Sequence, residues 1–207
     1  MTEALSFIHR FERGAATEPP LLLLHGTGGD ENDLLPLGEM IAPGATMLSP
    51  RGKVLENGMP RFFRRLADGV FDEDDVRRRA VDLADFIVAA SARYGVPVPI
   101  ALGYSNGANT AAAVLLLRPE ALAGAILLRA TLPLSETTPV DLTGKPVLIL
   151  SGAMDPMMSP ERAARLASLP QSYGAVVEHR TLPSGHELSQ TDVNLAKQWL
   201  SASKDIF

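Results

Sequence analysis

The sequence predicts an α/β fold: a mostly parallel central sheet of about seven strands with helices on both faces. Short, continuous apolar runs alternate with amphipathic stretches, a pattern typical of parallel strands that are buried on both faces and covered by helices. The 17 glycines and 16 prolines are scattered at the junctions between these stretches, where turns are expected. No repeat, low-complexity tract or linker interrupts the sequence, so we expect a single domain over residues 1–207.

The strands are predicted from two kinds of pattern. A segment of alternating character at residues 5–13 predicts an edge strand. Six short apolar runs bounded by turn residues predict the central strands, at residues 21–25, 46–49, 98–104, 124–128, 147–151 and 176–182.

Five amphipathic stretches predict the helices, at residues 33–41, 74–93, 106–118, 160–169 and 189–201. Ser159 followed by Pro160, and Ser189, are typical helix start signals. The regular alternation of strands and helices predicts a doubly wound sheet. The segment from Pro50 to about Phe71 looks irregular, and because long loops are uncommon in compact domains, we interpret it as a candidate substrate-binding loop.

The composition excludes several classes of function. A net charge of −5, from 19 Lys and Arg against 24 Asp and Glu, argues against a broad nucleic-acid surface. The sequence has no cysteine, which excludes a disulfide scaffold, a thiolate nucleophile, an iron–sulfur cluster and a cysteine-ligated zinc. Four histidines are left for imidazole chemistry.

The distribution of apolar residues predicts a cytoplasmic protein without stable membrane insertion. Charged residues interrupt the N-terminal segment MTEALSFIHRFERG before the core of a signal peptide can form. The longest apolar stretches, at residues 21–24, 111–117 and 121–128, are far shorter than the ~20 residues that a membrane-spanning helix needs.

The strongest local signal is GYSNG at residues 103–107, which matches the G-x-S-x-G pattern of a nucleophile at a strand-to-helix turn. A turn this sharp crowds the neighbouring backbone, so side chains at Gly103 and Gly107 would clash there. We therefore predict that Ser105 is a nucleophile exposed near a helix N-terminus. The alternative is a serine that caps the helix in a glycine-rich turn.

A serine hydroxyl is a poor nucleophile at neutral pH and needs a base, which in turn needs an acid to orient it. His186 lies in PSGHE, between the last strand and the last helix, and Asp155 follows another strand at the same edge of the sheet. The chain order Ser, Asp, His is that of α/β-hydrolases. We predict His186 as base and Asp155 as acid; the alternative for Asp155 is a cap of the helix that begins near Ser159.

The segment LLLLHGTGGDEND supplies a glycine-rich turn directly after the first central strand. We predict that an oxyanion hole forms there, from the backbone N–H of Thr27 and the N–H of Asn106, the residue after the nucleophile. GTGG also resembles a phosphate-binding turn, but neither G-x-G-x-x-G nor a Walker lysine is present. We therefore expect no nucleotide and no other cofactor.

These segments together resemble the phospholipase/carboxylesterase group of small α/β-hydrolases. The resemblance covers most of the chain and rests on LLLLHGTGGDE, LSPRG, GYSNGAN, LILSGAMDP and SGHEL in that order, while LENGMPRFFRRLADGVFDEDD is similar to bacterial MhqD-like carboxylesterases. It implies the α/β-hydrolase fold, with Ser105, Asp155 and His186 as the triad and Thr27 and Asn106 at the oxyanion hole. The chain is short for that fold, which implies no large cap domain. Members are often dimers, so a homodimer stays open beside a monomer.

Substrate contacts are expected from loops at the same edge of the sheet. We assign apolar contacts to Phe62, Phe63, Met157 and Leu188, with ordinary core packing as the alternative. Arg129 ends a strand and is a candidate for holding an anionic substrate group; the alternative is structural pairing with an acid.

The acidic run DEDD at residues 72–75 precedes basic residues of a predicted helix. Acids in a first helical turn interact favourably with the helix dipole, so we interpret the run as a helix start and predict no metal.

The sequence therefore predicts a serine carboxylesterase that cleaves small-molecule esters of small or medium acyl chains through an acyl-enzyme. Thioesters or lysophospholipids are alternative substrates of the same chemistry. A non-catalytic binding protein on a hydrolase scaffold is the alternative from another class.

Overall fold

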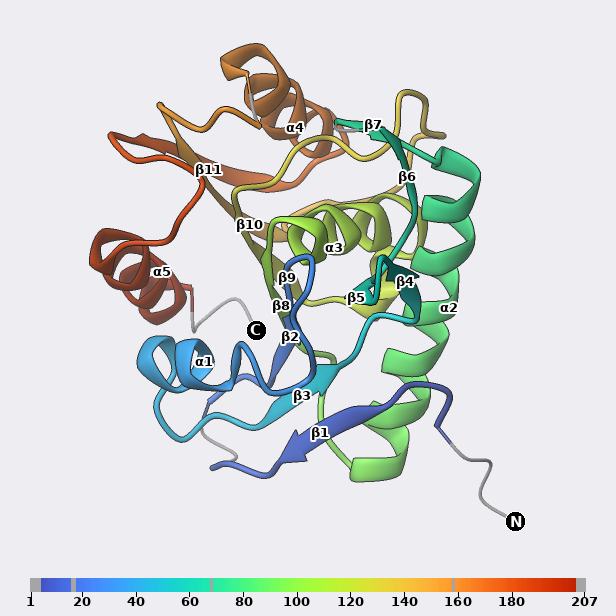
Figure 1. Ribbon diagram of the computed structural model, residues 1–207. Coiled ribbons are helices and arrows are strands. Elements are labelled where there is room, and N and C mark those ends of the chain that lie inside the picture. The colour runs from blue at the N-terminus through green and yellow to red at the C-terminus, as the bar shows by residue number, and fades with distance from the viewer. Residues whose placement is uncertain (1–4, 16–17, 68, 158, 204–207) are drawn as a thin grey trace.

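A seven-stranded sheet lies between two layers of helices in the computed structural model, which describes residues 5–15, 18–67, 69–157 and 159–203 (Figure 1). The strand order is β1-β3-β2-β8-β9-β10-β11. β1 (His9–Glu12) pairs antiparallel with β3 at one edge. The other strands run parallel and are β2 (Leu21–Leu24), β3 (Met47–Pro50), β8 (Ile100–Tyr104), β9 (Gly124–Leu128), β10 (Pro146–Gly152) and β11 (Val176–Leu182).

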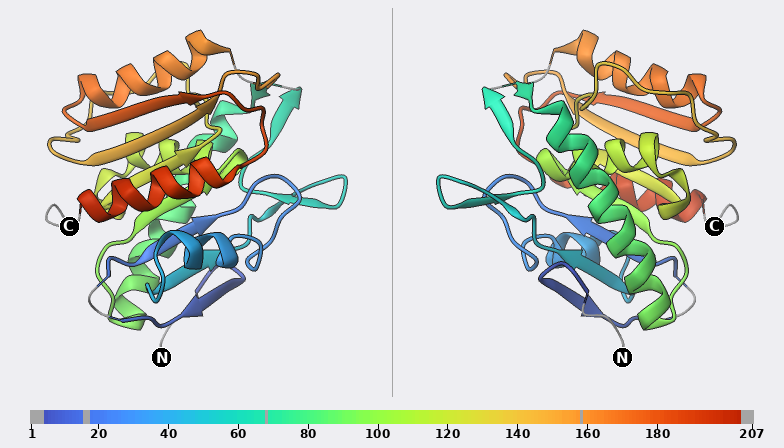
Figure 2. Two further views of the ribbon diagram at one scale, coloured as in Figure 1. Left: turned by 90° about the vertical axis from the view of Figure 1, so that its left-hand side faces the viewer. Right: turned by 90° about the vertical axis from the view of Figure 1, so that its right-hand side faces the viewer.

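Helices cover both faces of the sheet, as Figure 2 shows from two opposite sides. α1 (Leu35–Ile41) and α5 (Gln190–Ala202) lie together on one face. α2 (Glu73–Tyr94) and α3 (Asn106–Leu117) pack on each other over the opposite face, and α4 (Pro160–Ser172) packs against β11. A short 3₁₀ turn, η1 (Pro119–Ala121), follows α3.

The side chains of β2 illustrate how the sheet divides the core. Leu22 and Leu24 belong to the apolar cluster under α2 and α3, whereas Leu21 and Leu23 belong to the cluster under α1 and α5. All four leucines are fully buried, because successive strand residues point to opposite faces and both faces are covered. This explains why the strand reads as an unbroken apolar run.

The predicted order and type of the main strands and helices are confirmed, but the segment from Pro50 to Phe71 is not irregular. It contains two hairpins, β4 (Val54–Glu56) with β5 (Met59–Arg61), and β6 (Arg65–Ala67) with β7 (Val70–Phe71). The turn of the first hairpin is Asn57–Gly58, whose φ angles of 52° and 79° suit this dipeptide. The prediction overlooked that local signal.

No large cap occurs in the described ranges. The insertions at the carboxyl edge of the sheet are the two short hairpins. Within the same ranges, no helix combines the length and the apolar character needed to cross a membrane.

Candidate active site

The sheet brings four loops together at its carboxyl edge. After β2 the chain moves outward to β3, whereas the strands from β8 to β11 extend in the other direction, so β2 and β8 flank a topological switch point. Open α/β sheets form crevices at such points. Thr27 follows β2, Ser105 follows β8, Asp155 follows β10 and His186 follows β11.

Ser105 lies on a strained turn between β8 and α3. Its φ and ψ are 52° and −114°, an uncommon conformation for a residue other than glycine. A Cβ at Gly103 would lie 2.6 Å from the Cα of Ala108, and one at Gly107 would lie 2.0 Å from the carbonyl oxygen of Leu24. Both glycines are therefore required sterically. The Ser105 side chain makes no capping hydrogen bond to α3, which removes the alternative of a helix-capping serine.

Gly107→Ala is expected to destabilise the protein by about 3 kcal/mol or more, because the new methyl group would force α3 away from β2. The measurement is the midpoint of urea unfolding. Gly185→Ala is the matched control, since its Cβ would meet no atom closer than the Met154 carbonyl oxygen at 3.8 Å. Equal midpoints for the two variants would contradict the steric explanation.

A continuous hydrogen-bonded relay joins three predicted site residues. His186 Nε2 lies 2.9 Å from Ser105 Oγ, and His186 Nδ1 lies 2.7 Å from Asp155 Oδ2. The Asp155 side chain is fully buried, and its other oxygen accepts a hydrogen bond from the backbone N–H of Met157. Ser159 itself caps α4, so Asp155 is not needed for that role. In this geometry the carboxylate holds the proton on Nδ1, and Nε2 is free to accept the proton of the hydroxyl.

Arg129 holds the loop that carries His186. This arginine has a φ of 56° and a fully buried side chain. Its guanidinium donates to the carbonyl oxygens of Gly185 at 2.9 Å and Glu187 at 3.0 Å, on either side of His186. It also forms an ion pair with Asp192 at 2.7 Å. The structure thus selects the pairing alternative and corrects the expectation that Arg129 holds a substrate anion, because its donors are already engaged.

Asp192 connects this arginine to the start of α5. Its carboxylate accepts hydrogen bonds from the backbone N–H and the hydroxyl of Ser189, both at 2.8 Å. Burial raises the pKa of Asp192, but the hydrogen bonds from Arg129 and Ser189 outweigh it and hold the pKa below its ordinary value. The carboxylate is therefore ionised at neutral pH and stabilises the guanidinium.

The backbone N–H groups of Thr27 and Asn106 are both available at the cavity that Ser105 lines. Neither donates a hydrogen bond to another part of the chain that the structure describes. Two such donors beside a nucleophile can stabilise the negative oxygen of a tetrahedral intermediate. An oxyanion hole formed by these two N–H groups stays a prediction.

The first hairpin and Phe62, which directly follows it, form hydrogen bonds at the positions of both donors. Gly28, next to Thr27, donates its N–H to the carbonyl oxygen of Pro60 at 3.0 Å. The N–H of Phe62 donates to Asn106 Oδ1 at 2.8 Å. Prediction of the site from sequence missed this function of the Asn106 side chain, because its partner lies 44 positions earlier in the chain.

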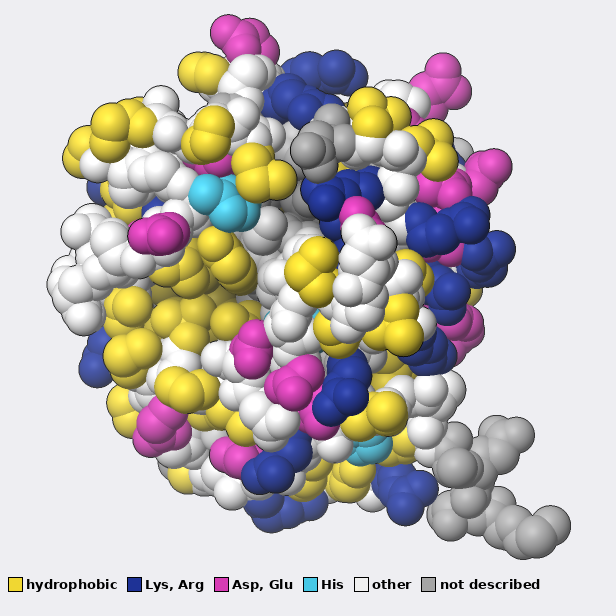
Figure 3. All heavy atoms as spheres, in the orientation of Figure 1, with side chains coloured by type: hydrophobic (Ala, Val, Ile, Leu, Met, Phe, Trp, Pro, Cys, Tyr) yellow, Lys and Arg dark blue, Asp and Glu magenta, His cyan; other side chains and the backbone are white. Residues whose placement is uncertain are grey.

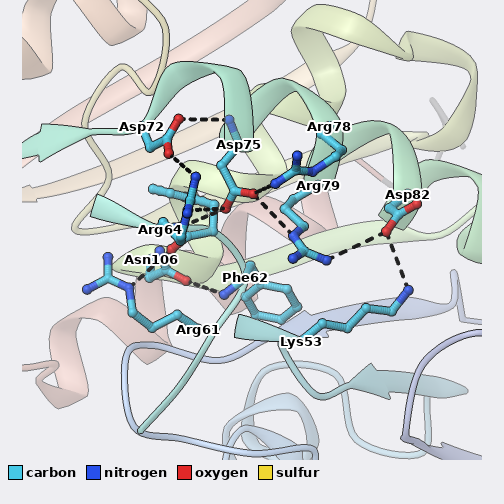
Figure 4. A network of polar contacts seen from close by, with 11 residues as sticks. Lys53, Arg61, Phe62, Arg64, Asp72, Asp75, Arg78, Arg79, Asp82 and Asn106 are labelled. Atoms are coloured by element: carbon cyan, nitrogen blue, oxygen red, sulfur yellow. Dashed lines mark hydrogen bonds and ion pairs between the residues drawn. The ribbon is translucent and has the colours of Figure 1, made fainter. Parts of the chain in front are cut away.

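An ionic network then ties the hairpin segment to α2 (Figure 4). The buried carboxylate of Asp75 accepts the backbone N–H of Arg64 at 2.8 Å and contacts the guanidinium groups of Arg78 and Arg79. Asp72 caps α2 by accepting the N–H of Asp75. The acidic run therefore begins the helix, as predicted. Among the residues whose placement is described, no group of three or more His, Asp or Glu is arranged to hold a metal.

His25 directly follows β2 and lies two positions before Thr27. Its Nε2 accepts the N–H of Gly52 at 3.0 Å, its Nδ1 donates to the carbonyl oxygen of Gly26 at 2.7 Å, and its ring packs against Phe62 at a centroid distance of 4.7 Å. Burial lowers the pKa of His25, which favours the neutral ring that this pair of hydrogen bonds requires. His25 is thus structural.

The free energy of unfolding is expected to fall as the pH drops below about 6.5. The unfolded chain then binds a proton at His25 that the folded chain does not, so stability declines by up to about 1.4 kcal/mol per pH unit. Burial lowers the pKa of His179 as well and adds a contribution of the same sign. Chemical denaturation between pH 5 and 7.5 measures the slope. His25→Gln should have a shallower slope, and an unchanged slope would contradict the role assigned to the neutral ring.

The cavity at Ser105 is small, about 50 Å³. Met157 lines it, as predicted. Phe62 and Phe63 do not: they are only 2% and 1% exposed and belong to the core under α2 and α3. The assigned substrate contacts of the two phenylalanines are therefore corrected to core packing. Apart from the residues already placed, the wall consists of Arg61, Arg65, Gly69, Phe71, Asn109, Thr131 and Arg162.

Leu188 lines a different space, a more open groove of about 470 Å³ between α1 and the loop that carries His186. Figure 3 shows this groove as a hollow bordered by hydrophobic side chains. Thr27 lies on the wall of both spaces, and Tyr104 on the wall of the groove. Tyr104 also donates from its hydroxyl to the carbonyl oxygen of His186 at 3.2 Å. The groove and the cavity at Ser105 thus meet at Thr27.

Comparisons with known proteins identify the family and the fold of the chain. No protein-family model matches the chain. It is 44% identical over 193 residues, 92% of its length and 96% of the relative, to a Bacillus subtilis (strain 168) protein named "Putative hydrolase MhqD". The crystal structure of the Bacillus cereus carboxylesterase matches with a TM-score of 0.91 and 43% identity, over 96% of this chain and 93% of that one. A carboxylesterase from Mesorhizobium loti matches with a TM-score of 0.86 and 35% identity, over 91% and 90%. These matches confirm the predicted α/β-hydrolase fold.

Proposed function

The chain belongs to the carboxylesterase-like family of α/β-hydrolases, and on that premise we propose that it is a serine carboxylesterase acting through an acyl-enzyme on Ser105. The observation that carries the proposal is the unbroken relay from Asp155 through His186 to Ser105, with donor distances of 2.7 and 2.9 Å. The family supplies the class of reaction, and the relay supplies the mechanism.

In the first half of the proposed reaction, Ser105 Oγ attacks the ester carbonyl carbon while His186 Nε2 takes the hydroxyl proton. The carbonyl oxygen becomes negative and accepts hydrogen bonds from the N–H groups of Thr27 and Asn106. The bond to the alcohol oxygen then breaks, and His186 gives its proton to the leaving alcohol. The buried carboxylate of Asp155 stabilises the imidazolium throughout.

In the second half, water attacks the acyl-enzyme. His186 takes a proton from the water, and the same two N–H groups stabilise the second tetrahedral intermediate. When the bond from the acyl carbon to Ser105 breaks, the proton returns to Oγ and the carboxylic acid leaves. Each substrate ester and water yield one acid and one alcohol.

Small and medium acyl chains are the proposed substrates, because the 50 Å³ cavity at Ser105 holds only a few heavy atoms. A series of p-nitrophenyl esters from acetate to palmitate tests this. We expect kcat/KM to be highest for short chains and to fall at least about tenfold towards palmitate. The apolar groove beside α1 favours the competing candidate, an acyl-thioesterase or lysophospholipase, and a preference for palmitate would support that candidate instead.

A further inference from the structure

The small cavity at Ser105 has a markedly basic wall. Among the described residues that line it, four are arginines and none is acidic. Figure 3 shows basic side chains beside a hollow in the upper half of the face that it presents. Three of the four arginines are paired with carboxylates: Arg61 and Arg65 with Glu56, at 2.7 and 2.8 Å, and Arg129 with Asp192. The fourth is Arg162.

Arg162 lies in the first turns of α4 and differs from the other three arginines. Its guanidinium donates to the carbonyl oxygen of Gly69 at 2.8 Å, and it forms no ion pair within the described part of the chain. Glu73, which lines the adjoining space, is engaged with the backbone N–H and hydroxyl of Ser135 at 3.0 Å. Among the described residues, Arg162 is thus left without an ion-pair partner, Glu73 included.

Thr131 supplies a second, independent observation on the same wall. Its hydroxyl is buried, and no atom of the described residues accepts or donates a hydrogen bond to it. The backbone N–H of Thr131 donates to Asn109 Oδ1 at 2.8 Å, which fixes the residue in place. A buried hydroxyl without a partner costs free energy unless a ligand satisfies it.

The space beyond Arg162 is large enough for a substituent of several atoms. A second cavity of about 310 Å³ adjoins the first, and the two share Gly69, Phe71, Thr131 and Arg162 on their walls. Arg165, one helical turn after Arg162, also lines this second cavity. A substrate whose ester group lies at Ser105 can therefore extend past Thr131 and Arg162.

We propose that the substrate is an ester with a free carboxylate, and that this carboxylate binds Arg162 and accepts a hydrogen bond from the Thr131 hydroxyl. The inference rests on the proposed esterase function and specifies its substrate class. An arginine is well suited to a carboxylate, because its planar fork donates two parallel hydrogen bonds.

The test compares esters that differ only in charge. The first pair is mono-p-nitrophenyl succinate and its neutral counterpart p-nitrophenyl butyrate, which tests a carboxylate on the acyl side. The second pair is 4-acetoxybenzoate and its neutral counterpart p-tolyl acetate, which tests a carboxylate on the alcohol side. In at least one pair, wild type should prefer the anionic ester, and Arg162→Gln should reduce the ratio of kcat/KM for the anionic ester to kcat/KM for the neutral ester by about tenfold. Arg180→Gln, the same change at an exposed arginine of β11, is the matched control.

Thr131→Val tests whether the Thr131 hydroxyl binds the substrate or only stabilises the fold. Because the hydroxyl has no partner in the described chain, its removal should leave the urea midpoint unchanged or higher, yet it should lower the preference for the anionic ester. An unchanged preference in both Thr131→Val and Arg162→Gln, with the neutral esters still cleaved, would overturn the carboxylate site and leave the esterase proposal intact.

Binding without turnover provides a readout that does not depend on catalysis. Succinate should raise the Tm of Ser105→Ala, the neutral analogue succinamide should not, and Arg162→Gln should abolish the shift. If none of the esters is cleaved but succinate still raises the Tm through Arg162, the esterase proposal fails and the anion site is retained. If succinate has no effect and no ester is cleaved, both proposals fail.

Discussion

Ser105→Ala is expected to lower kcat for p-nitrophenyl butyrate by roughly 10⁶-fold while the protein stays folded. The loss is large because the hydroxyl forms the covalent bond in the proposed reaction, and no neighbouring group can replace it. Folding should persist because the Ser105 side chain does not cap α3 and its hydroxyl is hydrogen-bonded to His186 instead. Steady-state kinetics and the urea midpoint measure the two effects.

His186→Ala and the double variant Ser105→Ala/His186→Ala are the controls for this prediction. Residues that act as one unit show non-additive losses, so the double variant should be about as slow as either single variant. A Ser105→Ala protein that keeps more than about a tenth of the wild-type kcat would contradict the nucleophile assignment. Additive losses would contradict the relay.

Arg129→Met is expected to reduce stability by about 3–5 kcal/mol and kcat by at least about tenfold. The change leaves the buried carboxylate of Asp192 without its cation. It also removes the donors to the carbonyl oxygens of Gly185 and Glu187, which hold the His186 loop at the distance of the relay. Urea unfolding measures the loss of stability. Steady-state kinetics measure the fall in kcat, and KM should change little.

The two roles of Arg129 can be separated with Asp192→Asn. In the double variant Arg129→Met/Asp192→Asn no buried charge is unpaired, while the amide oxygen can still accept from Ser189 at the start of α5. We expect the double variant to recover about 1 kcal/mol or more relative to Arg129→Met, with kcat still low. Recovery of kcat together with stability would contradict the positioning of His186 by Arg129.

The succession of strands and helices along the chain, and the residues of the relay, could be predicted because both depend on local signals. Apolar runs identify strands that are buried on both faces, and glycines two positions before and after Ser105 indicate a turn that tolerates no Cβ. Asp155 and His186 each follow a strand of the same parallel sheet, so the end of each strand determines its position.

The contacts that depend on tertiary structure could not be predicted in this way. Phe62 and Phe63 are aromatic residues of a loop segment near the site, and nothing local indicates that their rings turn into the core while the N–H of Phe62 holds Asn106. The pairing of Arg129 with Asp192 joins residues 63 positions apart. The unpartnered hydroxyl of Thr131 becomes apparent only when all its neighbours are known.

The most direct test of the central claim is to map the site of covalent modification by a fluorophosphonate. The probe reacts with a serine only when a base activates it and the site binds its tetrahedral phosphorus. Folded wild type should gain one adduct by intact mass, and peptide mapping should place it on Ser105; His186→Ala and urea-unfolded protein should gain none. Modification at another residue, or equal labelling of His186→Ala, would contradict a Ser105 nucleophile activated by His186.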